Sequence, residues 1–177
     1  MSDILDKVIG DQDFFKKLLA KIPGFKGYIE RGDRRMSDKL LRDKIADEFE
    51  TQYQRVSSLQ RDLINHGEIG YIDDLESAAI KLRQFIDRVR TASYGYAGLF
   101  DAIKIKQEEL EQVYQYDSAL LDLSETVKSA IDNVETSIGT DGLDASIRHL
   151  ISVSQQCVDA FNKRSEVMKG IAEEAQN

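Results

Sequence analysis

The chain has 177 residues, a net charge of -8, 41% apolar and 32% charged residues, one proline and eleven glycines. This composition is typical of a folded, helix-rich domain and excludes a disordered or collagen-like chain. The single cysteine excludes an intramolecular disulfide, and the longest stretch without charge, about ten residues, is far shorter than the ~20 residues of a transmembrane helix.

The charge is distributed unevenly along the chain. Residues 1–66 carry 13 basic and 12 acidic side chains, whereas residues 67–177 carry 11 basic and 20 acidic ones. Because phosphate contacts require concentrated Lys and Arg, the acidic larger part argues against a nucleic-acid partner. The lone cysteine and the acidic N-terminus, which has no secretory signal, favour a cytoplasmic location.

Residues 1–36 are expected to form an N-terminal amphipathic helix and a basic, aromatic connector, followed by a helical bundle over residues 37–177. Pro23 should end the short helix, because proline has no backbone N–H and disfavours helical geometry in the preceding residue. Seven basic and two acidic residues lie between positions 14 and 35. The candidate interaction surface in this stretch consists of Lys16, Lys17, Lys21, Phe25, Lys26, Tyr28, Arg31, Arg34 and Arg35.

Three uses of this basic, aromatic segment remain open from the sequence. It could fold back on the bundle, with its aromatic residues covering one end and its arginines pairing with the acidic helices. It could lie on an anionic membrane surface, where an apolar face inserts and cations meet head groups. It could also bind an acidic surface of a protein partner.

The bundle itself is predicted from apolar residues that recur at alternating steps of three and four, the spacing of coiled-coil and bundle seams. A second helix should begin at Ser37 or Asp33 and end at Gly67. A third follows from Ile72 to Val89, so the connector HGEIGY should join an antiparallel pair. A fourth is expected over residues 99–138 and a last one over residues 143–171, separated by GTDG.

A few polar residues interrupt these seams. Lys106, Asp117 and Ser124 fall on the seam of the fourth helix. They could form a buried polar network that fixes the register of the helices, or they could lie at the edge of the core.

Two architectures fit the pattern. The favoured one is an all-α antiparallel bundle of four long helices with a short N-terminal helix, in which Gly95 and Gly98 form a turn or hinge. The alternative is an elongated arrangement with residues 72–138 as one long helix, about 100 Å at 1.5 Å per residue. Two glycines in a helix interior would cost it roughly 2 kcal/mol.

No motif for catalysis or for a cofactor is present. The chain lacks a phosphate-binding P-loop, and one cysteine and two distant histidines do not form a zinc set. Cys157 and His149 are eight residues apart on one predicted helix, roughly 12 Å along its axis, too far for a direct hydrogen bond. We therefore expect no catalytic residue, no cofactor and no metal ion.

The runs IPGFKGYIERGDRRMSDKLLRD and YGYAGLFDAIKIKQEEL resemble helical bacterial proteins of uncharacterised function. The resemblance implies a bacterial cytosolic origin and carries no activity. From the residues, the first expectation is a non-enzymatic helical scaffold or adaptor that contacts a protein partner or associates with itself. The alternative is a peripheral membrane protein that uses the basic N-terminal segment.

Overall fold

The structure, a computed structural model, describes residues 13–92 and 107–174. In these ranges every regular element is a helix, and the predicted all-α fold is confirmed. The elements are α2 (Asp13–Lys21), α3 (Phe25–Glu30), α4 (Arg34–Asn65), the short 3-10 helix η1 (Ile69–Tyr71), α5 (Ile72–Thr91), α7 (Gln107–Ser137) and α8 (Leu143–Glu174).

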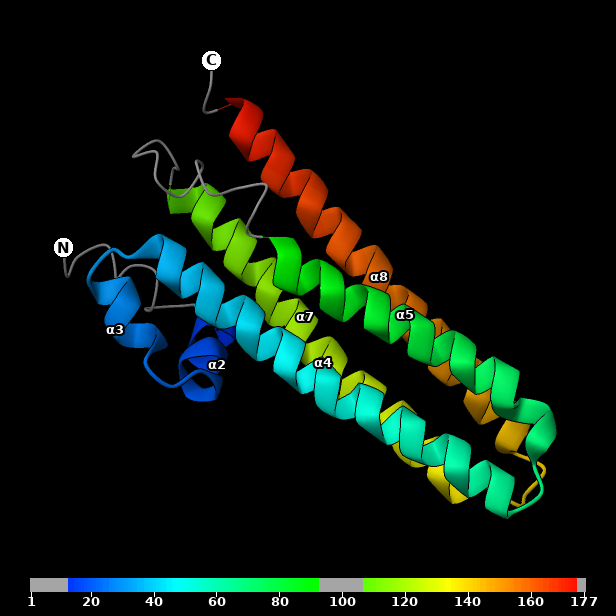
Figure 1. The fold of residues 1–177 in the computed structure, drawn as a ribbon. Coiled ribbons are helices and arrows are strands. Elements are labelled where there is room, and N and C mark those ends of the chain that lie inside the picture. The colour runs from blue at the N-terminus through cyan, green and yellow to red at the C-terminus, as the bar shows by residue number, and fades with distance from the viewer. Residues whose placement is uncertain (1–12, 93–106, 175–177) are drawn as a thin grey trace.

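The four long helices α4, α5, α7 and α8 lie side by side and alternate in direction along the chain (Figure 1). α4 packs against α5 and α7, and α8 packs against the same two helices. Each long helix therefore has two neighbours, as in a four-helix bundle. The apolar seams predicted from the sequence face the shared axis, where leucine, isoleucine, valine and phenylalanine side chains form the core.

The bundle consists of two antiparallel hairpins, α4–α5 and α7–α8. The hairpins pack so that α4 is parallel to α7 and α5 is parallel to α8. The parallel pairing of α5 with α8 is seen in two hydrogen bonds, because Lys81 donates to Gln155 at 2.8 Å and Arg88 donates to Asn162 at 2.8 Å. The helices α5 and α7 thus lie across the bundle diagonal from each other.

The elongated alternative is wrong. Gln60 on α4 donates to Glu76 near the start of α5 at 2.7 Å, and Arg55 on α4 donates to Asp132 near the end of α7 at 2.6 Å. In one straight helix, residues 76 and 132 would be about 84 Å apart at 1.5 Å per residue. One stretch of α4 touches both, so the chain must reverse between α5 and α7. The proposed hinge residues Gly95 and Gly98 lie outside the described residues.

The helix ends follow the local signals in the sequence. Asp33 is the N-cap of α4, because its carboxylate accepts a hydrogen bond from the Met36 backbone N–H at 3.1 Å. Gly67 and Gly139 follow the ends of α4 and α7 with positive φ angles of 78° and 76°. These left-handed conformations suit glycine and reverse the chain into each hairpin, as predicted.

Candidate functional site

The N-terminal helices α2 and α3 fold back onto the side of the bundle, where α2 contacts α7 and α3 contacts α4 (Figure 1). Their apolar side chains Phe15, Leu18, Ile22 and Phe25 are buried. The Phe15 and Phe25 rings lie 6.0 Å apart and are 6.3 and 5.7 Å from the ring of Tyr114 on α7. The first of the three uses, docking on the bundle, therefore accounts for the apolar face of this segment.

The prediction that Phe25 belongs to the interaction surface is wrong. Phe25 is fully buried, because its ring fills the space between α3 and Tyr114, and it cannot contact a partner. Tyr28 is half-buried, and the Arg31 guanidinium lies over its ring at 4.6 Å. Arg34 is the first residue of α4, and its side chain lies outside the described part of the structure.

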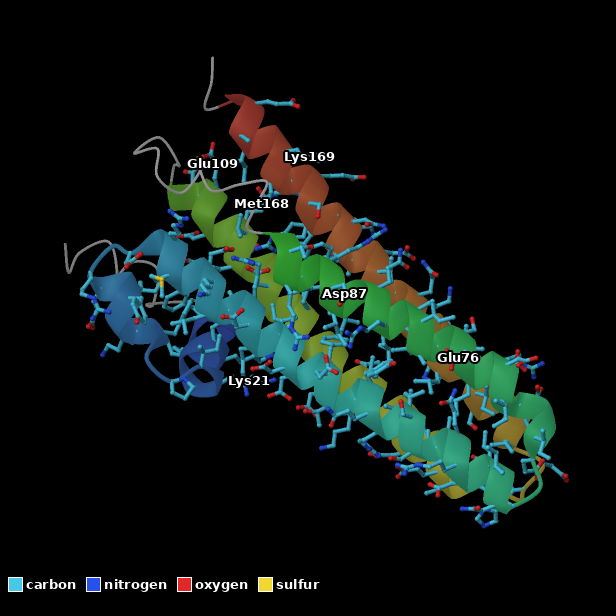
Figure 2. All side chains as sticks on the ribbon, in the orientation of Figure 1. Lys21, Glu76, Asp87, Glu109, Met168 and Lys169 are labelled. Carbon is cyan, nitrogen blue, oxygen red and sulfur yellow. The ribbon has the colours of Figure 1, made fainter. Side chains whose placement is uncertain are left out.

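The remaining cations of the predicted surface line the outside of the docked segment. We call them the cationic face, which consists of Lys16, Lys17, Lys21, Lys26, Arg31 and Arg35. Lys21 is half-buried on α2 (Figure 2), and the other members are exposed.

Two lysines of the cationic face form exposed ion pairs. Lys17 lies 3.6 Å from Asp122 on α7, and Lys26 lies 3.6 Å from Glu30 on its own helix. Exposed pairs of this kind contribute only about 0–1 kcal/mol. Within residues 13–92 and 107–174, Lys16 and Lys21 have no acidic side chain within 4.0 Å.

A second unusual feature is a cluster of four charged side chains in the bundle interior. We call it the ionic cluster, formed by Asp38, Arg42, Asp117 and Arg164. All four are at most 4% exposed. Arg164 Nε and Nη2 donate to the two carboxylate oxygens of Asp117, the second contact at 3.1 Å. Arg164 Nη2 also donates to Asp38 at 3.0 Å, and Arg42 donates to the other Asp38 oxygen at 2.8 Å.

The ionic cluster joins all four long helices. Asp38 and Arg42 come from α4, Asp117 from α7 and Arg164 from α8, while Arg42 Nη1 donates to the Val89 carbonyl of α5 at 3.4 Å. The charges alternate in sign along the chain of contacts and sum to zero. Each buried charge therefore has an opposite charge beside it. This pairing offsets the free-energy cost of burying a charge away from water.

Burial and pairing act in opposite directions on these groups. Burial lowers the pKa of Arg164, but the charges and hydrogen bonds of Asp117 and Asp38 outweigh it and raise the pKa above its ordinary value. Burial raises the pKa of Asp117, and Arg164 opposes that shift. The Arg164 guanidinium therefore stays charged, and its Nη1 has no hydrogen-bond partner among the described residues.

One member of the ionic cluster was visible as an exception in the sequence pattern. Asp117 interrupts the seam of its helix, and the interpretation as part of a buried polar network is confirmed for this residue. Ser124 is also buried but donates to the Leu121 carbonyl of its own helix at 2.7 Å. Lys106 lies outside the described residues. Sequence reasoning missed Arg164, Asp38 and Arg42 as members of the network, although the i, i+4 spacing of Asp38 and Arg42 on one helix is a signal for an ion pair.

The single cysteine is part of the core. Cys157 is fully buried, and its Sγ–H donates to the Val153 carbonyl at 3.3 Å. Burial raises the pKa of this thiol from 9.0 to about 12. His149 on the same helix is exposed, and His66 donates from Nδ1 to the Asp62 carbonyl at the end of α4, 2.8 Å away.

We expect the Cys157 thiol of the folded protein to resist a disulfide exchange reagent at pH 8, and to react fully once the chain is unfolded in guanidinium. Only the thiolate reacts, and burial removes both access and charge. Since the folded state holds the proton more tightly, this thiol's contribution to stability is intact below pH 9 and declines between pH 9 and about 12. The absorbance of the coloured thiol that the reagent releases measures the reaction. Fast release of this thiol without denaturant would contradict the burial of Cys157.

The described residues contain neither a candidate metal site nor a helix that could cross a membrane. No group of three or more His, Cys, Asp or Glu side chains within these ranges is placed to hold a metal ion. Among the helices of residues 13–92 and 107–174, none combines the length and apolarity needed to cross a bilayer.

Comparisons with known proteins found no matching family, no matching curated protein and no matching solved structure.

Proposed function

We propose that this protein is a non-enzymatic helical scaffold or adaptor that acts through protein–protein contacts. The observation that carries this proposal is the docking of α2 and α3, which places apolar side chains inside and the cationic face outside. Phe15, Leu18 and Phe25 are fully buried, whereas Lys16 and Lys26 are exposed on the same two helices. A charged surface held in place by a packed core is suited to binding an oppositely charged surface.

The ionisable groups inside the bundle support the same proposal. Asp117 and Arg164, which have the chemical groups of an acid–base pair, bind each other and Asp38. Cys157 has a raised pKa and is not poised as a nucleophile. A buried thiol on an intracellular scaffold also fits the cytoplasmic location expected from the sequence.

Peripheral membrane binding is the alternative, and the docked geometry supports it less well. An anchor of this kind inserts its apolar side chains into the lipid. On α2 and α3 those side chains are packed against Tyr114 and the rest of the core, so that only the cations are available to an anionic surface.

A photoreactive residue in place of Lys16 or Lys26 should form discrete adducts with a protein in cells. Both positions are exposed on the cationic face, so a bound partner lies within reach. The same residue at Ser152, which is exposed on α8, is the control and should give none of these adducts. Mass spectrometry identifies each adduct, and the absence of protein adducts from both cationic positions would contradict the proposed function.

A further inference from the structure

The surface of the bundle carries opposite charges in two separate regions. One is the cationic face of α2, α3 and the start of α4. The other, which we call the acidic end, comprises residues 60–76 and 132–149 around the α4–α5 and α7–α8 connections (Figure 1). The acidic end has two basic and nine acidic side chains.

The charges of the acidic end are only partly compensated within the molecule. Asp132 and Glu135 pair with Arg55 at 2.6 and 2.9 Å, and Asp144 pairs with Arg148 at 2.6 Å. Other acids of this end have no basic side chain within 4.0 Å among the described residues. These are Asp62, Glu68, Asp73, Asp74, Glu76 and Asp141.

Two exposed isoleucines lie in the same part of the chain. Ile64, on the last turn of α4, is 54% exposed, and Ile69, in η1, is 66% exposed. Together with Ile80, they are the large apolar side chains left most open to solvent in the described residues. An apolar centre with charged residues around it is the usual composition of a protein-binding surface.

One molecule cannot bring its two charged regions together. Lys17 on α2 docks beside Asp122, which is 15 residues from the end of α7, or about 22 Å at 1.5 Å per residue. Figure 2 places Lys21 toward the end where α4 begins and Glu76 toward the opposite end. An ion pair needs a separation below 4 Å, so complementary contact requires two molecules.

We propose that the acidic end of one copy binds the cationic face of a second copy, in a head-to-tail contact that rests on the proposed scaffold function. Charge complementarity selects this partner. Ile64 and Ile69 supply an apolar centre that packs against the aliphatic stems of the lysines. Because the two surfaces differ, the contact is heterologous, and each added copy leaves one surface of each kind free.

Sedimentation velocity on the purified full chain tests the proposal. At about 50 mM NaCl the sedimentation coefficient should rise with protein concentration. At about 500 mM NaCl the dissociation constant should be about tenfold or more higher, because salt screens the attraction between the two surfaces. A single monomeric species at every concentration and at low salt would overturn the proposal.

Charge reversal on each surface identifies the contact. Lys16→Glu with Lys21→Glu should weaken association about tenfold or more, because it lowers the net charge of the cationic face from +6 to +2. Asp62→Lys with Asp141→Lys should weaken it similarly, because it changes the net charge of the acidic end from -7 to -3. An equimolar mixture of the two variants should associate again as pairs, because the intact acidic end of the first variant can bind the intact cationic face of the second.

A matched control has the same change of charge elsewhere. Lys163→Glu with Lys169→Glu, both exposed on α8, should leave the dissociation constant within about twofold of the unmodified chain. Equal loss of association in this control, or failure of the mixture to associate, would overturn the proposal. Salt-dependent binding to vesicles of anionic phospholipid by a chain that stays monomeric would also overturn it, in favour of a membrane partner.

The outcome for self-association is separable from the outcome for the scaffold function. If photoreactive residues at Lys16 or Lys26 yield adducts with another protein while the purified chain remains monomeric, the head-to-tail contact fails and the scaffold function stands. If neither adducts nor association occur, both fail.

Discussion

Replacing Asp117 with alanine should lower the free energy of unfolding by about 3–5 kcal/mol, because it leaves Arg164 charged and poorly compensated in the bundle interior. Arg164 is 1% exposed and donates to Asp117 from two of its nitrogens. Asp38 alone would then have to serve both Arg164 and Arg42. Equilibrium urea denaturation, followed by circular dichroism of the helices, measures the loss.

Two comparisons show that the effect comes from the buried charge. Asp122→Ala on the same helix removes an exposed ion pair with Lys17 and should cost less than about 1 kcal/mol. Asp117→Leu combined with Arg164→Met removes both charges and should be more stable than Asp117→Leu alone. If the double variant were as unstable as the sum of its two single variants, the pairing would not be the source of the cost.

Replacing Phe25 with alanine should destabilise the docked α2–α3 segment by about 3–5 kcal/mol, the usual cost of removing a fully buried phenylalanine. The ring is fully buried and packs at 5.7 Å from Tyr114 and 6.0 Å from Phe15. Hydrogen exchange should show faster exchange of backbone amides over residues 13–31, while α5 and α8 keep their protection.

The half-buried Tyr28 on the same helix provides the comparison. Tyr28→Ala should alter exchange over residues 13–31 much less than Phe25→Ala does, because Tyr28 lies outside the core and mainly supports Arg31. Equal effects of the two substitutions would mean that the segment is held by its outer surface rather than by its apolar face.

These two predictions concern the features that keep the cationic face in position. The Phe15, Phe25 and Tyr114 rings hold α2 and α3 on the bundle, and the ionic cluster joins the four helices beneath them. A variant that loses the α2–α3 docking should also lose partner binding even when its lysines are intact. Variants of Lys16 and Lys21 therefore test the surface itself without disturbing the core.

Part of the candidate site could be read from the sequence. The concentration of cations between residues 14 and 35 located the cationic face, and the seam exception Asp117 pointed to a polar network. The pattern could not separate Phe25 from its neighbours, because a cationic, aromatic stretch has the same composition whether its rings face a core or a partner. Nor could it pair Asp38 with Arg164, since these residues are 126 positions apart.

The sequence by itself determined the local features of this protein. The apolar periodicity specified where the helices form, and single residues specified where they begin and end: Asp33 as an N-cap, and Pro23, Gly67 and Gly139 through their backbone conformations. These signals can be read from the sequence because each acts within a few residues. Only the tertiary structure decided that α5 and α7 lie diagonally, that Phe25 is buried and that the four charges meet. Those outcomes depend on which distant segments of the chain pack together. The free energy of burying a side chain depends on the residues around it, and these come from parts of the chain far away in sequence.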